Sequence, residues 1–215
     1  MRKTFKLTSR QKELLSIVFN YIRETGYPPS VEEMRESLGV ASNQSVLDLL
    51  YHLERKKMIK REEGIARSIA ILPFGYETID KPRLVPVLGA SHAGAPVNMV
   101  AIDGDWIPLP GKDVAKLNRE IFLLKVNGDS MINAGIDDGD LVLVQSQKEF
   151  SSGDVVLADL NGDSTVKRFI SNDSPPYIYL KPENPKYEII PFTHEMRLIG
   201  KVVSIIKNGE LRGVN

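Results

Sequence analysis

The spacing of apolar residues changes partway along this chain of 215 residues. Up to about residue 72, apolar side chains recur at the three- and four-residue intervals of amphipathic helices. From residue 84 onward they form short runs separated by Gly, Asp, Asn and Pro, which is typical of β-strands joined by turns. The chain is therefore expected to be an α+β protein with two domains, a helical front part and a mostly-β rear part.

The front part predicts three helices followed by a β-wing. Each helix begins after a residue with capping chemistry, and the first two end at a glycine. The first two caps belong to capping boxes, in which a residue three positions later caps in return. The residues that bound the predicted helices are Thr8 and Gly26, Ser30 and Gly39, and Ser42. Residues 56–61 and 65–71 then predict two strands around a turn at residues 62–64.

Helix, short turn, helix and wing is the order of a winged helix-turn-helix domain, with the third helix in the recognition position. We therefore expect binding to double-stranded DNA. Polar side chains of the third helix would read base edges, Leu47 would pack on a thymine methyl, and wing cations, Lys60 among them, would hold phosphates. The candidate DNA-binding residues are Ser42, Gln44, Ser45, Leu47, Asp48, Lys56, Lys57 and Arg67. The alternative is a helical protein-interaction domain whose cations form a solvated face.

The distribution of charge and the positions of Pro and Gly suggest where the domains divide. Residues 1–72 carry 13 Lys and Arg against 9 Asp and Glu, whereas residues 73–215 carry 15 against 19. This modest excess is consistent with only the front part meeting nucleic acid. Residues 73–82 contain Gly and charges between two prolines and have no sustained period, as expected of a linker. The expected domains are residues 1–72 and 83–215.

Composition excludes several classes of protein. The chain has no Cys, which rules out disulfides, thiolate nucleophiles and Cys-ligated zinc. Its three His residues show no metal-ligand spacing. No apolar run approaches the roughly 20 residues that span a bilayer, and the N-terminus does not resemble a signal peptide. We expect a cytoplasmic protein that needs no cofactor or metal and no membrane.

Two residues of the rear part carry candidate chemistry. Ser130 follows a buried apolar run and Gly128, so it is expected at the lip of a sheet, with the backbone N–H groups of Asp129 and Ser130 pointing at one spot as an oxyanion hole. Lys167 lies in a strand with apolar neighbours. If its amine is buried beside Ser130, desolvation lowers its pKa, and the neutral amine can take the proton of Ser130. The alternatives are a turn serine and a lysine that faces water.

Taken in order, these motifs resemble LexA-type repressors along nearly the whole chain. Residues 7–11, 25–30, 38–39 and 53–56 resemble the family's winged DNA-binding domain. Residues 89–96, 126–131 and 165–168 resemble its self-cleavage segment, nucleophile segment and general-base strand in a LexA/signal-peptidase-like domain. The resemblance implies a repressor of DNA-damage (SOS) response genes that forms a homodimer through its C-terminal domain.

The same resemblance implies that the bond between Ala93 and Gly94 is cut by the chain's own Ser130 and Lys167, promoted by RecA filaments on single-stranded DNA. Ser91 and His92, beside that bond, depart from the family pattern. Two interpretations follow. The chain is a self-cleaving repressor, or a regulator whose β-domain serves only dimerisation or sensing while the dyad stays idle. A protease acting on other proteins is a weaker third interpretation.

Overall fold

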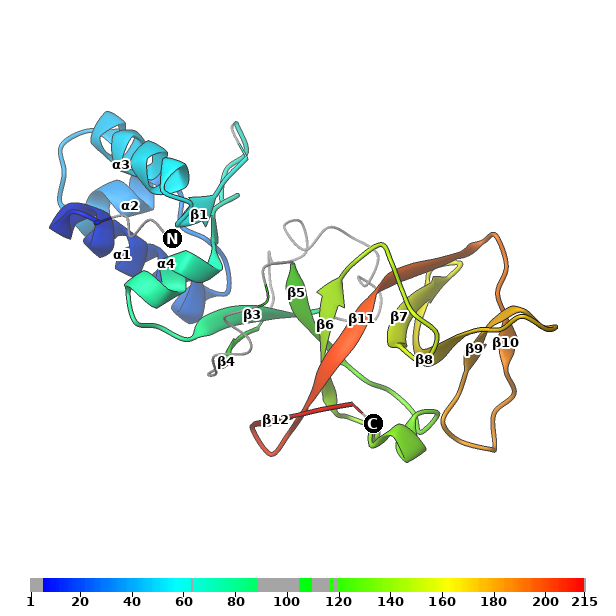
Figure 1. Cartoon of the computed structure of the whole chain (residues 1–215). Coiled ribbons are helices and arrows are strands. Elements are labelled where there is room, and N and C mark those ends of the chain that lie inside the picture. Colours follow the sequence, from blue (N-terminus) through cyan, green and yellow to red (C-terminus); the bar gives the residue numbers. More distant parts are fainter. Residues whose placement is uncertain (1–5, 63, 89–104, 110–116, 118–119, 215) are drawn as a thin grey trace. The chain divides into compact units, whose positions relative to one another are not determined.

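The computed structural model describes residues 6–62, 64–88, 105–109, 117 and 120–214. These residues form two compact units (Figure 1). The first unit runs to Val85 and includes strand β4 (Trp106–Leu109). The second begins at Pro86, inside strand β3 (Arg83–Leu88), and contains the rest of the chain from β5 onward. No helix in the described ranges is long and apolar enough to cross a membrane.

The first unit contains the three predicted helices. Its helices are α1 (Ser9–Thr25), α2 (Val31–Leu38), α3 (Asn43–Arg55) and α4 (Pro73–Thr78). Both predicted capping boxes are confirmed: Thr8 and Gln11 bond reciprocally at 3.1 and 3.2 Å, and so do Ser30 and Glu33 at 2.6 and 3.3 Å. The helices surround one apolar core, which includes Leu14, Leu15, Val18, Met34, Val46, Leu50, Leu53 and Met58.

The wing is present with shorter strands than the sequence predicted. Strands β1 (Ile59–Lys60) and β2 (Ala70–Ile71) pair antiparallel, and residues 65–69 belong to neither. Ser68 explains the difference, because its hydroxyl accepts from the Glu62 N–H at 3.0 Å and lies 2.9 Å from the carbonyl oxygens of Glu62 and Ile65. A side chain therefore takes the bonds that a strand ladder would have used.

The structure also differs from the sequence interpretation at residues 73–82. Pro73–Thr78 forms α4, which belongs to the first unit, and Tyr76 is part of that unit's core. Gly75 allows the helix to lie against the wing, since a Cβ there would be 2.4 Å from the Met58 carbonyl oxygen. The proline opens a helix at its first position, where its missing N–H costs nothing. Helix α4 is therefore a packed part of the first unit, whereas residues 80–82 are exposed.

The second unit is mostly β, as predicted. Its strands after β3 are β5 (Ile121–Lys125), β6 (Leu141–Ser146), β7 (Val155–Leu160), β8 (Asp163–Ser171), β9 (Ile178–Lys181), β10 (Ile190–Pro191), β11 (Met196–Lys207) and β12 (Glu210–Arg212). The sheet order is β10-β9-β8-β7-β11-β6-β5-β3, with β12 paired to β11. Strands β3 and β5 are parallel, and the pairs formed by β5 through β12 are antiparallel.

Two hairpins of the second unit turn at an Asn-Gly pair. Asn161 and Gly162, a residue pair that favours a hairpin turn, both have positive φ and join β7 to β8. Asn208 and Gly209 have the same conformation and join β11 to β12, which the sequence interpretation overlooked. Among the short runs of the rear part, residues 187–190 form a strand only at Ile190, because Tyr187 donates its backbone N–H into a turn, to the Asn184 carbonyl, at 3.1 Å.

Strand β7 is buried on both faces and separates two apolar clusters. Val155 and Leu157 belong to the larger cluster, whereas Val156 and Ala158 belong to a smaller one. Lys167 on β8 is directly opposite Val156, so its side chain leaves the sheet on the face of the smaller cluster. The register thus places an amine over apolar surface.

Candidate active site and DNA-binding face

Ser130 lies on a tight segment between two regular elements. It follows β5 and precedes the short 3-10 helix η2 (Ile132–Ala134). Gly128 has φ +91°, a conformation that L side chains rarely adopt, and its N–H donates to the Asp138 carboxylate at 2.6 Å. The glycine therefore makes the turn that brings Ser130 to the edge of a cavity of about 340 Å³.

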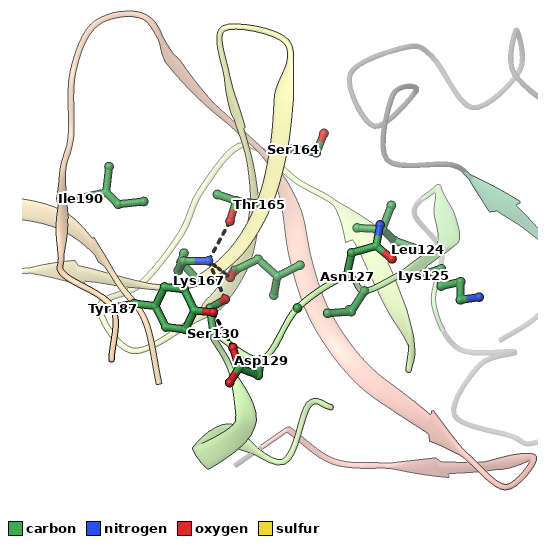
Figure 2. A pocket seen from close by; sticks show the side chains of 13 residues that line it. Leu124, Lys125, Asn127, Asp129, Ser130, Ser164, Thr165, Lys167, Tyr187 and Ile190 are labelled. Carbon is green, nitrogen blue, oxygen red and sulfur yellow. Dashed lines mark hydrogen bonds between the residues drawn. The ribbon is translucent and has the colours of Figure 1, made fainter. Parts of the chain in front are cut away.

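Lys167 reaches the same cavity from β8, and Figure 2 shows its amine directed at Ser130. The Lys167 Nζ donates to the Ser130 Oγ at 2.8 Å, to the Thr165 Oγ1 at 2.7 Å and to the Val166 carbonyl oxygen at 2.9 Å. Thr165 and Lys167 are two residues apart on one strand face, which explains why the Thr165 hydroxyl lies beside the Lys167 amine. The structure thus brings together the two side chains that the sequence singled out.

Burial changes the acidity of this lysine. Lys167 is 7% exposed, and desolvation lowers its pKa from 10.5 to about 8. Removing an ammonium ion from water disfavours its charged form, and no counter-charge offsets that effect among the causes of the shift. The neutral amine is therefore accessible slightly above neutral pH, next to a hydroxyl group.

The backbone at Ser130 suits an oxyanion hole. Within the described ranges, the Ser130 N–H donates to no other group. Asp129 is held beside it: the Tyr187 hydroxyl donates to its carboxylate at 2.5 Å, and Lys186 Nζ lies 3.8 Å away. The Tyr187 bond is the main reason why the pKa of Asp129 is lowered, and the backbone N–H of Asp129 itself also contributes. The Ser130 N–H is therefore unbonded among the described residues, as an oxyanion donor is before it meets its acceptor.

The bond predicted to be cut joins Ala93 to Gly94. Ala93 and Gly94 lie outside the described residues. The described ranges also contain no group of three or more His, Asp or Glu residues that could hold a metal ion.

The predicted reading face lies on α3. Gln44, Ser45 and Asp48 are exposed, and Leu47 is partly exposed. Ser42 caps the helix, with its Oγ 3.3 Å from the Ser45 N–H and 3.1 Å from the Ser45 hydroxyl. The Gln44 amide donates to the Asp48 carboxylate at 2.8 Å, which links the two polar side chains one helical turn apart.

Two of the predicted phosphate-binding cations have protein partners. Lys56 donates to the Lys6 carbonyl at 3.0 Å and to the Gln11 side chain at 2.8 Å. Arg67 donates to the Pro28 carbonyl at 3.0 Å and to Glu33 at 2.9 Å, and its guanidinium lies 4.5 Å from the Tyr27 ring centroid.

The Arg67 contact lowers the pKa of Glu33 to about 2, with a further contribution from the Tyr21 hydroxyl. Glu33 therefore stays ionised over the ordinary range of pH and holds the wing against the first turn of α2. Lys57, at the end of α3, is exposed and has a positive φ, as Arg67 does, but within the described ranges its side chain has no hydrogen bond or ion pair. The four predicted roles in DNA binding of Lys56, Lys57, Lys60 and Arg67 remain predictions.

Comparison with known proteins decides the family. A profile described as LexA DNA binding domain matches residues 4–68, and one described as Peptidase S24-like matches residues 86–203. A protein named LexA repressor from Desulfitobacterium hafniense (strain DSM 10664 / DCB-2) is 38% identical over 202 residues, covering 94% of this chain and 97% of that protein. The chain belongs to the LexA repressor family. The resemblance inferred from the sequence is confirmed.

Other LexA repressors match to the same degree. The LexA repressor of Bacillus subtilis (strain 168) is 38% identical over 207 residues, covering 94% of this chain and 98% of that protein. The LexA repressor of Halalkalibacterium halodurans is 39% identical over 207 residues with the same coverage. Within this LexA-family chain, the peptidase-like match contains both Ser130 and Lys167, and the DNA-binding match contains α1, α2, α3 and β1.

Sequence reasoning missed the residues that support this LexA-family site. Thr165 could have been found, because a polar side chain two positions before a strand lysine shares its face. Asn184 and Tyr187 carry no such signal. They contact Asp129 from a loop 55 and 58 residues away in sequence, and only the folded sheet brings them there.

Proposed function

We propose that this chain is a transcriptional repressor of SOS genes that binds operator DNA as a dimer and is inactivated by cutting its own Ala93–Gly94 bond. The observation that carries the proposal is the 2.8 Å contact between Lys167 Nζ and Ser130 Oγ, together with the lowered pKa of that amine. A lysine facing water would have neither property. The membership of the LexA repressor family supports the DNA-binding half.

The proposed reaction begins with the neutral amine of Lys167. As the Ser130 Oγ attacks the carbonyl carbon of Ala93, its proton passes to Nζ, and negative charge develops on the carbonyl oxygen beside the Ser130 N–H. The tetrahedral intermediate then breaks its C–N bond while the Lys167 ammonium protonates the leaving nitrogen of Gly94. Water, deprotonated by the same amine, hydrolyses the ester between Ala93 and Ser130 and regenerates the hydroxyl.

Cleavage would inactivate the repressor by separating two functions. A single DNA-binding domain binds DNA weakly, so two such domains, joined through the C-terminal domains, are needed for useful affinity on a palindromic site. The proposed cut follows the residues matched to the DNA-binding family and leaves Ser130 and Lys167 on the other fragment. RecA filaments on single-stranded DNA, in the cytoplasm, would promote the reaction by binding the state in which the segment is docked at Ser130.

A DNA-binding assay tests both halves of this proposal. The uncleavable Ser130→Ala chain is used to select a duplex oligonucleotide from a random pool. Unmodified chain is then incubated at pH 10, returned to pH 7.5 and mixed with that duplex. We expect binding to fall at least 10-fold for the unmodified chain and to persist for Ser130→Ala. Loss of binding in both would indicate alkaline denaturation, and persistence in both would favour the regulator with an idle dyad.

A further inference from the structure

The peptide unit between Asp129 and Ser130 connects the oxyanion hole to a neighbouring loop. Because a trans peptide is planar, the Asp129 carbonyl and the Ser130 N–H point in opposite directions from one rigid group. Any contact that fixes the direction of the carbonyl oxygen therefore also fixes the direction of the N–H. The proposed mechanism needs that N–H aimed at the oxygen of the scissile carbonyl.

The Asp129 carbonyl oxygen accepts two hydrogen bonds. Its bond from the Ile132 N–H is 3.3 Å and belongs to the local turn. The other is from the side-chain amide of Asn184, at 2.9 Å, and comes from the loop between β9 and β10. Asn184 is 6% exposed, so this amide has little access to water. The shorter of the two bonds is thus provided by a buried polar side chain from another segment.

Asn184 is itself held in place. Its side-chain oxygen accepts from the Lys186 N–H at 3.1 Å, which leaves the amide nitrogen directed at Asp129. The preceding residue, Glu183, accepts the Asn133 N–H at its carbonyl at 2.9 Å and the Arg168 guanidinium at its carboxylate at 2.6 Å. The loop is therefore attached both to the helix after Ser130 and to the strand that carries Lys167.

We propose that Asn184 is a positioning residue for self-cleavage, whose amide orients the 129–130 peptide so that the Ser130 N–H stabilises the oxyanion. The inference rests on the proposed function. Within the described residues, Asn184 has no hydrogen bond to Ser130 Oγ or to Lys167, so it acts through the backbone. Loss of its amide leaves the nucleophile and the base in place and makes the oxyanion donor less well aimed.

The test measures self-cleavage rates of the full chain between pH 6.5 and 10.5. Asn184→Ala removes the amide, and Asn184→Leu replaces it with an apolar side chain of similar size. Asn172→Ala is the matched control. Asn172 lies in the turn between β8 and β9, and its side-chain amide also donates one hydrogen bond, to the Tyr179 hydroxyl at 3.4 Å.

We expect both Asn184 variants to lower the plateau rate at high pH by roughly 10- to 100-fold, less than the loss of an oxyanion donor outright. The pH midpoint should stay within about 0.3 units of the unmodified chain, because the surroundings of Lys167 are unchanged. The control should keep the unmodified rate and midpoint. A merely structural role for Asn184 would disturb the burial of Lys167 and move the midpoint, which would overturn the inference.

The inference and the proposed function fail in different ways. If the unmodified chain does not cleave at any pH, the proposed function fails and the inference with it. If it cleaves and the Asn184 variants cleave at the same rate, the inference alone is wrong.

A second measurement leaves Asn184 unchanged, so it tests the inference even if the Asn184 variants do not fold. In the full chain carrying Ser130→Ala, NMR should show slow solvent exchange of the Asn184 side-chain amide protons, as expected for a buried hydrogen bond. Exchange as fast as that of the exposed Asn172 amide would contradict the inference.

Discussion

In the proposed mechanism, the chemistry depends on Lys167, because its buried amine must be neutral for the reaction to begin. Its pKa of about 8 results from desolvation, and its three hydrogen bonds place it against Ser130, Thr165 and the strand backbone. The neutral form, which is the base in the proposed mechanism, predominates above the pKa. The rate of cleavage should therefore be controlled by the titration of this one group.

The first prediction is the pH dependence of that rate. The first-order rate constant should rise about 10-fold per pH unit below the midpoint, and level off above a midpoint near pH 8. Quantifying the intact chain by gel densitometry between pH 6 and 10.5 gives the profile. A rate that falls with increasing pH, or one that does not vary, would mean that no amine acts as the base.

The second prediction concerns stability. In the folded chain the pKa of Lys167 lies near 8, below the unfolded value of about 10.5. Between these pH values the unfolded chain therefore binds more protons than the folded chain. The free energy of unfolding rises with pH over this range, so Lys167 becomes less destabilising. In a Ser130→Ala background, Lys167→Met should increase the free energy of unfolding by up to about 3 kcal/mol more at pH 7.5 than at pH 10.5. Urea unfolding at both pH values measures this. An equal gain at both would show that the amine is not desolvated.

Among the elements, those with local signals were predictable from the sequence. The capping boxes at Thr8 and Ser30 fixed where α1 and α2 begin, and Asn161-Gly162 located the turn between β7 and β8. Helix α4 was not predictable, since its six residues have too little length for a period and it forms because Gly75 packs against Met58. Likewise, the 2.8 Å contact between Ser130 and Lys167 depends on sheet register, which residue types alone do not reveal.

The wing gives a prediction about which cations meet DNA. Arg67 anchors the wing through Glu33 and Pro28, whereas the Lys57 side chain has no hydrogen bond or ion pair with the described residues. Arg67→Ala should lower both DNA affinity and the thermal unfolding temperature of the N-terminal unit, by a few degrees, because half-exposed ion pairs contribute about 1 kcal/mol or less. Lys57→Ala should lower DNA affinity alone, with a smaller salt dependence.

These two variants are compared by fluorescence anisotropy on the selected duplex and by calorimetry. Unchanged stability in Arg67→Ala would contradict the anchoring role of its contacts with the protein. Unchanged affinity in Lys57→Ala would remove it from the predicted phosphate contacts.

In the chain taken as a whole, one family match contains helices α1, α2 and α3, and another contains the paired serine and lysine. This arrangement suits a repressor that carries the means of its own inactivation. An intramolecular reaction needs no open substrate cleft, and its rate depends on how often the segment docks rather than on concentration. Dilution of the protein should leave the proposed first-order rate unchanged.

The most direct measurement is the intact mass of the chain after incubation at pH 10. We expect two fragments, one ending at Ala93 and one starting at Gly94, whereas Ser130→Ala and Lys167→Ala should keep the full mass. Fragments with other ends, or the same fragments from Ser130→Ala, would contradict the claim that this serine and this lysine cut their own chain.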